Sequence, residues 1–301
     1  GGAGGASGTS LPVLHDAIVK YTAALKVVWI DWHCAAGPHL TPGAADPYDL
    51  NDAAAFFASM ATTYAANPYV WYGVQNEPGG GSDTDSLGVW NTTRKNQWVT
   101  AARTVTDAVR AAGARAPMVI GSMMSAQDLS ATDVASGPFA LTYALSLVDR
   151  SAIVKYWSEI TTGFNDATTG YPNIIGDVHL YGNYSGTGGD TALREFVDYC
   201  NGNGIAIIFG EYGMQDTQTF KLTSAQRMHA LRSTKYFGDC IYVADAGDQY
   251  NLTTSAAVSG RFSVQDTVNY LTTPTNLKAI GNICWDGTHV GTFPATGTGT
   301  S

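Results

Sequence analysis

Apolar residues in this chain follow two patterns in turn, and the alternation predicts its fold class. Longer segments with apolar positions three and four apart predict helices, and short continuously apolar runs predict strands that are buried on both faces. Helices are predicted at residues 11–26, 51–66, 91–112, 191–201 and 223–237, with one or two more within about 138–162. Strands are predicted at residues 27–33, 69–74, 117–122, 174–181 and 205–211. Helices that alternate with strands at this spacing predict an α/β fold with a parallel sheet, either closed or open.

The two ends of the chain depart from this pattern. Residues 1–10 and 292–301 are rich in Gly, Ser and Thr, which predicts a flexible N-terminal segment and a linker-like tail. A single domain would then extend over residues 11–291. Its last strand has two candidates, residues 240–244 and residues 280–285. We favour the second candidate, because it ends in an aromatic residue, Trp285, that precedes a polar loop.

Composition and charge exclude several classes of partner. Sixteen Lys+Arg against 25 Asp+Glu give a net charge of −9 without a basic run, so the chain lacks the charges that bind nucleic-acid phosphates. No apolar run approaches the roughly 18 residues of a membrane span.

Only 14% of the residues are charged, and Asn-x-Ser/Thr sequons occur at Asn91, Asn183 and Asn251, which favours a secreted protein. The cysteines are too scattered for a Cys-rich metal site and leave two disulfides, one or none open: Cys34, Cys200, Cys240 and Cys284.

The stretch WYGVQNEPGG at residues 71–80 is the most informative in the chain. An apolar strand ends there in Asn76, Glu77, a proline and glycines, so Glu77 stands where a buried strand gives way to a loop. Parallel α/β barrels place catalytic groups at this end of their strands. Strict alternation would send Asn76 and Glu77 to opposite faces of the sheet, so a site that uses both requires a bulge or a twist.

A second stretch, IIFGEYG at residues 207–213, repeats this arrangement with Glu211 at the end of an apolar strand. Two carboxyl groups on two such strands can face each other across the mouth of a barrel. Hydrolysis of a glycosidic bond uses a pair of this kind, because one group protonates the leaving oxygen while the other attacks or stabilises the anomeric carbon.

The order of the motifs resembles the clan A glycoside hydrolases, and most closely family 5, which contains cellulases and mannanases. The motifs are Asp31-Trp32-His33, Asn76-Glu77-Pro78, His179-Leu180-Tyr181, Glu211-Tyr212-Gly213 and Trp285. The resemblance covers about residues 14–290 and implies a (β/α)8 TIM barrel, from its third strand to its eighth. The family's first βαβ portion has no counterpart before Leu11, and neither does the Arg that normally ends the second strand, since the first Arg here is Arg94. We therefore expect this sequence to begin inside the barrel.

The resemblance also implies a role for each motif residue. Glu77 would be the acid/base and Glu211 the nucleophile of a retaining, double-displacement mechanism that needs no cofactor and no metal. The supporting residues would be Asn76 on the sugar 2-hydroxyl, His33 and His179 around the scissile bond, Tyr181 on Glu211, and Trp285 as a stacking floor. Trp32, with Tyr48, Trp71 and Trp90, would supply further stacking along an open cleft. We expect a secreted, monomeric enzyme that cleaves a polysaccharide internally, with β-1,4-glucan as first choice of substrate and β-mannan as second.

Other readings of the sequence have less support. A non-catalytic carbohydrate-binding protein on a degenerate barrel would explain the missing Arg, but it would have no need for both glutamates. Residues 82–86 (SDTDS) resemble a calcium loop, yet Leu87 falls where a ligand oxygen is required, so a solvated loop is predicted. His33 beside Cys34 has no companion pair at metal-ligand spacing.

Overall fold

Strands and helices alternate throughout the part of the chain that the computed structural model describes. These are residues 11–34, 37–85, 87–129, 145–164, 172–212, 219–231 and 234–239. In chain order the elements are α1 (Leu11–Ala23), β1 (Val28–Asp31), α2 (Leu50–Tyr64), β2 (Val70–Gly73), α3 (Thr92–Ala111), β3 (Met118–Gly121), α4 (Leu147–Arg150), α5 (Ala152–Thr161), β4 (Ile174–Leu180), α6 (Gly189–Gly202), β5 (Ile207–Tyr212), α7 (Thr219–Leu231) and β6 (Gly238–Asp239).

The strands form one sheet in the same order as in the chain, β1-β2-β3-β4-β5-β6. The pairs β1 with β2, β2 with β3, β3 with β4, and β5 with β6 are all parallel. A doubly wound sheet reverses its strand order at a switch point, whereas a (β/α)8 barrel adds each new strand beside the last one. The strand order is therefore that of a barrel, and the predicted α/β class is confirmed.

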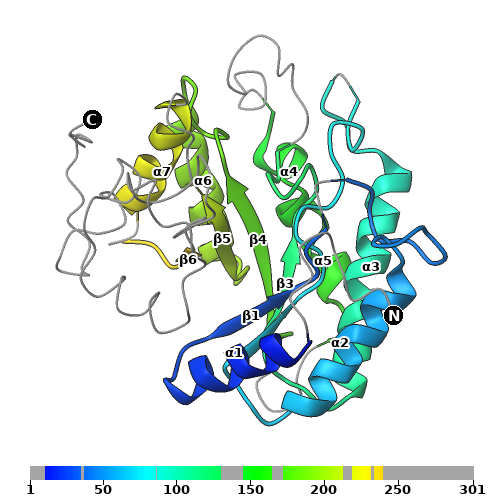
Figure 1. Ribbon diagram of the computed structural model, residues 1–301. Helices are drawn as coiled ribbons and strands as arrows, with labels where there is room; N and C mark the ends of the chain where they lie inside the picture. Colours follow the sequence, from blue (N-terminus) through cyan, green and yellow to red (C-terminus); the bar gives the residue numbers. More distant parts are fainter. Residues whose placement is uncertain are drawn as a thin grey trace, which may run out of the picture. The chain divides into compact units, whose positions relative to one another are not determined.

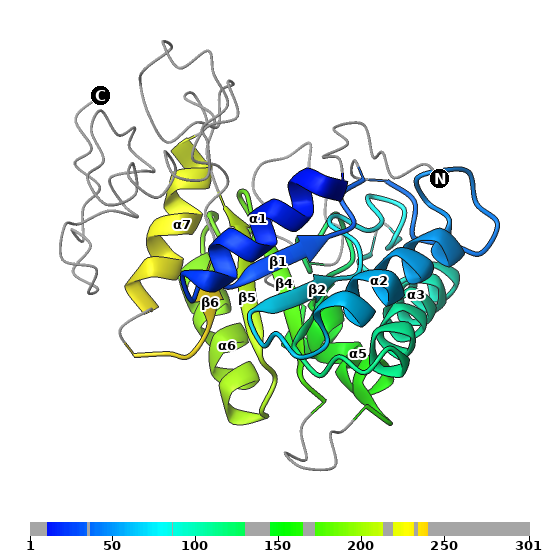
Figure 2. The same cartoon turned by 60° about the horizontal axis from the view of Figure 1, so that its bottom comes forward.

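The chain divides into two compact units. The N-terminal unit comprises Gly1–Ala131 and Val148–Asp177, and the C-terminal unit comprises Thr132–Leu147 and Val178–Ser301. In the N-terminal unit α2 packs against α3, α3 against α5, and α1 against β1, as Figures 1 and 2 show. Buried apolar residues of the helices and strands make its core: Ile30, Phe57, Val70, Val105, Val109, Met118 and Ile120.

Polar side chains begin three helices of this unit. Asp49, Asn91 and Ser151 each accept a hydrogen bond from a backbone N–H in the first turn of α2, α3 and α5, respectively. Each bond satisfies one of the N–H groups that the start of a helix leaves without a partner. These caps place the helix starts within one residue of the predicted ones for α2 and α3.

The C-terminal unit contains the end of β4, then α6, β5, α7 and β6, with α6 packed against α7. Its core is aromatic. The ring of Phe196 on α6 lies 6.5 Å from that of Phe209 on β5 and 6.4 Å from that of Tyr184. Phe209 in turn meets Phe237 edge-on at 5.3 Å, which fixes the chain just before β6.

The predicted helix bounds differ most from the structure at α7. The helix predicted at residues 223–237 begins at Thr219 and ends at Leu231, and α1 ends at Ala23 instead of residue 26. The backbone N–H groups of Thr234 and Lys235 both donate to Leu231 O at 3.0 Å, and this turn directs the chain into β6. Both candidates for the last strand, residues 240–244 and 280–285, lie outside the described residues, as do the predicted flexible segment at 1–10 and the tail at 292–301.

Two of the three sequon asparagines have roles in the described structure. The side chain of Asn183 is fully buried, with Nδ2 donating to His179 O. Asn91 is exposed, and its side-chain oxygen caps α3. Cys34 is a buried free thiol, and Cys200 is buried as well. Burial raises the pKa of the Cys34 thiol to about 11, which makes it unreactive at neutral pH. Among the described residues, no helix has the length and apolar character needed to cross a membrane.

Candidate active site

Glu77 follows β2 in the N-terminal unit. β2 ends at Gly73, three residues before Asn76, so the alternation of strand faces no longer applies there and the predicted bulge is unnecessary. Two backbone hydrogen bonds hold the chain beyond the end of the strand. Val74 N donates to Val119 O at 3.0 Å, and Asn76 N donates to Trp32 O at 3.2 Å. Asn76 is buried, and Glu77 is partly exposed.

A glycine in β3 makes room for this turn of the chain. A Cβ atom on Gly121 would lie 2.5 Å from Gln75 O and 2.7 Å from Asn76 O. The backbone that leads to Glu77 therefore rests directly on β3. Any side chain at position 121 would displace it.

The residues after β1 lie in the same unit. His33 Nδ1 is 3.3 Å from Asp31 Oδ2, and 54% of the His33 side chain is exposed. Asp31 thus fixes the rotation of a ring that remains accessible. Trp32 donates from Nε1 to Pro47 O at 2.8 Å and packs at 5.5 Å from the ring of Phe56.

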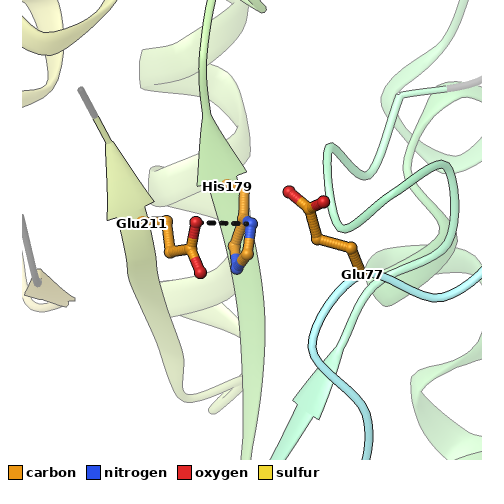
Figure 3. A group of neighbouring side chains, drawn as sticks. All are labelled: Glu77, His179 and Glu211. Carbon is orange, nitrogen blue, oxygen red and sulfur yellow. Dashed lines mark ion pairs between the residues drawn. The ribbon is translucent and has the colours of Figure 1, made fainter. Parts of the chain in front are cut away.

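Glu211 is the fifth residue of β5 in the C-terminal unit, and 16% of its side chain is exposed. Tyr181 donates its hydroxyl to Glu211 Oε2 at 2.9 Å, which is the hydrogen bond that the family resemblance implies. His179 Nδ1 lies 3.6 Å from the same oxygen, and Figure 3 shows this ion pair. The hydroxyl stabilises the ionised carboxylate without transferring a proton to it, and together the two contacts fix its rotation.

The ring of His179 is itself supported. It is fully buried at the end of β4 and lies edge-on to Tyr181, at a centroid distance of 6.3 Å. Asn183 Nδ2 donates to His179 O at 2.9 Å, and Ser224 Oγ of α7 donates to Asn183 O at 2.6 Å. The side chains that meet Glu211 are therefore held by a helix as well as by their own strand.

A family model described as cellulase (glycosyl hydrolase family 5) matches residues 7–248, which is most of the chain. The chain belongs to glycosyl hydrolase family 5.

Solved structures agree with this family. The fold is similar to that of XacCel5A in complex with cellopentaose (14% identity, covering 86% of this chain and 77% of that chain, TM-score 0.54). It is also similar to a variant of the endoglucanase Cel5A of Thermobifida fusca with cellotetraose (19% identity, 89% and 71%, TM-score 0.52), and to a mannanase from Streptomyces sp. SirexAA-E (16% identity, 82% and 66%, TM-score 0.52). At these identities the likeness shows the fold alone, which is part of a family 5 TIM barrel. A search of curated proteins finds no match.

The structure corrects the expected row of stacking aromatics in this family 5 chain. Trp90 is only 4% exposed, and its Nε1 donates to Asp149 O at 2.8 Å, so it is a core residue. The contact with Asp149, which lies in α4, places its indole in the interior. Trp71 and Tyr48 are partly exposed, and Trp285 lies outside the described residues.

The predicted solvated loop at residues 82–86 is also wrong for the first of its two acids. Asp83 is fully buried and lies 3.0 Å from a buried histidine, His39. One signal for this is present in the sequence: three consecutive glycines, residues 79–81, precede Ser82 and Asp83, and such a loop can fold tightly around a side chain. Gln75 was likewise missed. Its side chain accepts from Leu40 N at 3.2 Å and donates to Pro38 O at 2.9 Å, so it holds the loop after β1.

Within the described part of either unit, His, Cys, Asp and Glu side chains do not form a group of three that could hold an ion. The first Arg of the chain, Arg94, lies in the first turn of α3, where Nη1 donates to Gln97 Oε1 at 3.3 Å.

Proposed function

We propose that this family 5 chain is a retaining endo-β-1,4-glucanase in which Glu211 is the nucleophile and Glu77 is the acid/base. The observation that carries the proposal is the environment of Glu211 at the end of a buried strand. Its Oε2 accepts a hydrogen bond from the Tyr181 hydroxyl and forms an ion pair with His179. A carboxylate fixed in this way is suited to attack a carbon atom in a defined direction.

In the first step, Glu77 donates its proton to the glycosidic oxygen while the bond from that oxygen to the anomeric carbon breaks. Glu211 forms an ester bond to the same carbon, and the leaving sugar departs with the proton from Glu77. In the second step, water attacks the anomeric carbon and gives its proton to Glu77. The ester bond breaks, and Glu211 returns to a carboxylate.

Retention of configuration sets a distance between the two carboxyl groups. They must lie about 5–5.5 Å apart, because a gap of roughly 6.5–9.5 Å would admit a water molecule and lead to inversion. Proton NMR of the first product released from a cello-oligosaccharide tests this directly. We expect the β-anomer at early times, and an α-anomer would contradict the retaining mechanism.

The proposed substrate is β-1,4-glucan, with β-mannan as the alternative. Relatives of the same fold were solved with cellopentaose and cellotetraose, and another is a mannanase. The two polymers differ in the orientation of the sugar 2-hydroxyl, which we assign to Asn76. Release of reducing ends from carboxymethyl cellulose, glucomannan and mannan, measured in parallel, distinguishes them.

A slow substrate separates catalysis from simple binding. A 2-fluoro aryl cellobioside should form a stable ester on Glu211, which peptide mass spectrometry would locate, and Glu211→Gln should remain unlabelled. Binding without any label would favour a carbohydrate-binding protein instead. Since a polysaccharide is too large to enter a cell, we also propose that the chain acts outside the cell, as a monomer.

A further inference from the structure

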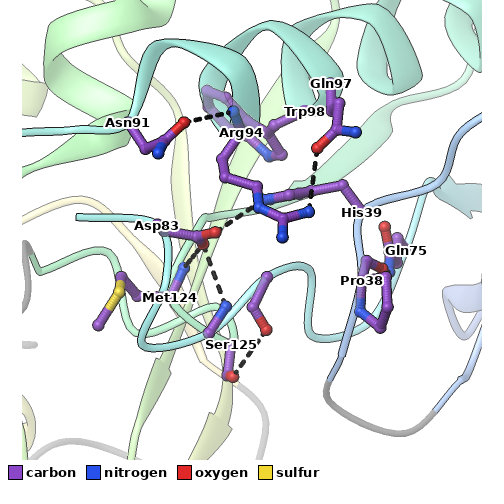
Figure 4. Close-up of polar contacts among 12 residues, drawn as sticks. Pro38, His39, Gln75, Asp83, Asn91, Arg94, Gln97, Trp98, Met124 and Ser125 are labelled. Carbon is purple, nitrogen blue, oxygen red and sulfur yellow. Dashed lines mark hydrogen bonds and ion pairs between the residues drawn. The ribbon is translucent and has the colours of Figure 1, made fainter. Parts of the chain in front are cut away.

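Three loops of the N-terminal unit meet on one buried carboxylate, that of Asp83 (Figure 4). Its Oδ1 lies 3.0 Å from Nε2 of His39, in the loop after β1. Its Oδ2 accepts from Gly80 N at 3.2 Å, in the loop after β2, and from Met124 N at 2.9 Å, in the loop after β3. One side chain therefore joins the carboxyl ends of three neighbouring strands.

The contact with Asp83 assigns the donor of this pair. A carboxylate only accepts hydrogen bonds, so Nε2 of His39 donates to Asp83. Nδ1 is buried and has no hydrogen-bond partner among the described residues.

The loop that follows Glu77 is shaped around this carboxylate. Gly79 has a φ of +76°, which favours glycine, and a Cβ atom on it would overlap Asp83 Oδ2. The carboxylate thus fills the space that a side chain at position 79 would occupy. Asp83 N also donates to Gly80 O at 2.9 Å, which closes the turn.

The same loops hold the backbone directly after Glu77. Pro78 O accepts from Ser125 N at 3.0 Å, next to Met124 in the loop after β3. Gly79 N donates to Gly37 O at 2.7 Å, in the loop that also contains His39. Any movement of these loops would pass to the residue that carries the proposed catalytic acid.

We propose that Asp83, held by His39, is a positioning residue for Glu77. By joining the three loops, it fixes the backbone on which the Glu77 carboxyl group is aimed at the glycosidic oxygen. This inference rests on the proposed function of Glu77 as the acid/base. It assigns Asp83 no contact with the substrate.

Asp83→Ala tests the inference when its rates are compared on two substrates whose leaving groups differ in their need for a proton. We expect kcat for cellotetraose to fall about 100-fold, because a shift of the acid by about 1 Å has that effect. On 2,4-dinitrophenyl cellobioside, whose leaving group needs little protonation, the bond-breaking step should slow much less, by less than about tenfold. Added azide should accelerate the variant on this substrate, because azide attacks the ester intermediate without a general base. KM should change little.

Asp85→Ala is the matched control in the same loop. Asp85 Oδ1 accepts from Leu87 N at 2.8 Å and Val89 N at 2.9 Å, so its loss removes contacts of the same kind within this loop and leaves the bonds between the three loops in place. Its kcat should remain within about twofold of wild type on both substrates, as for most exposed sites.

A pair of substitutions at His39 supports the test if Asp83→Ala fails to fold, as judged by circular dichroism. His39→Gln keeps an N–H donor at the position of Nε2 and should retain most of the kcat on cellotetraose. His39→Leu removes the donor and should show the same dependence on leaving group and the same azide response as Asp83→Ala.

Equal losses on both substrates without an azide response, in folded Asp83→Ala or His39→Leu, would overturn the inference, and so would unchanged kinetics. Glu77→Gln is measured alongside. If Glu77→Gln itself lacks the leaving-group dependence, or if wild type has no activity on any β-glycan, the proposed function fails. If Glu77→Gln shows the leaving-group dependence and the Asp83 and His39 variants do not, only the positioning role fails.

Discussion

Glu77 and Glu211 both stand at the carboxyl ends of parallel strands, but their surroundings fix them at different levels. The backbone around Glu77 is held by β3, where Gly121 lies beneath the chain, and by the three loops that meet on Asp83. The carboxylate of Glu211 is held directly, by Tyr181 and His179.

This difference suits the two proposed roles. A nucleophile must remain an anion, and a donor on its oxygen stabilises that charged form. An acid/base must gain and lose a proton in every cycle, and contacts that hold its backbone set its position without favouring either state. The comparison therefore predicts that changes near Glu211 alter the charge of the carboxylate, whereas changes near Glu77 alter its position.

The largest effect is expected for Glu211→Gln. Without a nucleophile, activity on polymer and on activated aryl glycosides should both fall by at least about 10⁴-fold. Initial rates on both substrates measure this. Glu195→Gln, the same substitution at an exposed site on α6, is the control and should be active. Activity of Glu211→Gln on aryl glycosides near that of the wild type would assign the nucleophile elsewhere.

A selective loss is expected for Glu77→Gln. Hydrolysis of polymer should fall by about 10²–10⁴-fold, the usual contribution of a general acid, and activated aryl glycosides should be far less affected. Steady-state rates on carboxymethyl cellulose and on 2,4-dinitrophenyl cellobioside give the ratio. Glu159→Gln, at a site 44% exposed on α5, is the matched control. An equal loss on both substrates would reject Glu77 as the acid.

A smaller effect is expected for Tyr181→Phe, which removes one donor from the Glu211 carboxylate. We expect kcat to fall about tenfold, in keeping with the loss of a charge-assisted hydrogen bond. The acidic limb of the pH–rate profile should move to higher pH, because the ionised carboxylate loses a stabilising partner. The pH dependence of kcat/KM measures both. An acidic limb at its original pH would mean that Tyr181 does not act on the charge of Glu211.

The smallest effect concerns stability rather than catalysis. Burial raises the pKa of Asp128 from its ordinary value of 3.8 to about 6, against the opposing hydrogen bonds from Ser122 and Ser151. A raised folded-state pKa contributes stability that is complete below about pH 4 and is lost as the pH rises through about 6. Asp128→Asn should remove this dependence, worth at most about 3 kcal/mol.

Urea unfolding of both proteins from pH 4 to pH 7 measures the difference in the free energy of unfolding. A constant difference across that range would contradict the shift. The experiment also shows whether a pH effect on rate near pH 5 comes from folding or from the site.

The local patterns predicted most of the described fold. Apolar runs flanked by turn residues located β1 to β5 to within a few residues, since a strand buried on both faces needs such a run. Helix starts were predicted well where a cap residue precedes them, as at Asn91. The end of α7 was missed because the turn after Leu231 depends on residues distant in the sequence. One of them is Asn201, whose Oδ1 accepts from Tyr236 N at 2.9 Å.

The sequence by itself determined the strand that precedes each glutamate, because a buried strand needs an apolar run. Its motifs also carried the resemblance to family 5, which implied the pairing of Tyr181 with Glu211. Only the tertiary structure decided the burial of Asp83, His39, Trp90 and Asn183. Each of these polar or aromatic side chains would suit a surface loop, and each is buried because segments distant in the sequence supply its hydrogen-bond partners. A one-dimensional pattern does not show which loops will meet, since their partners lie up to 59 residues away along the chain, as for Trp90 and Asp149.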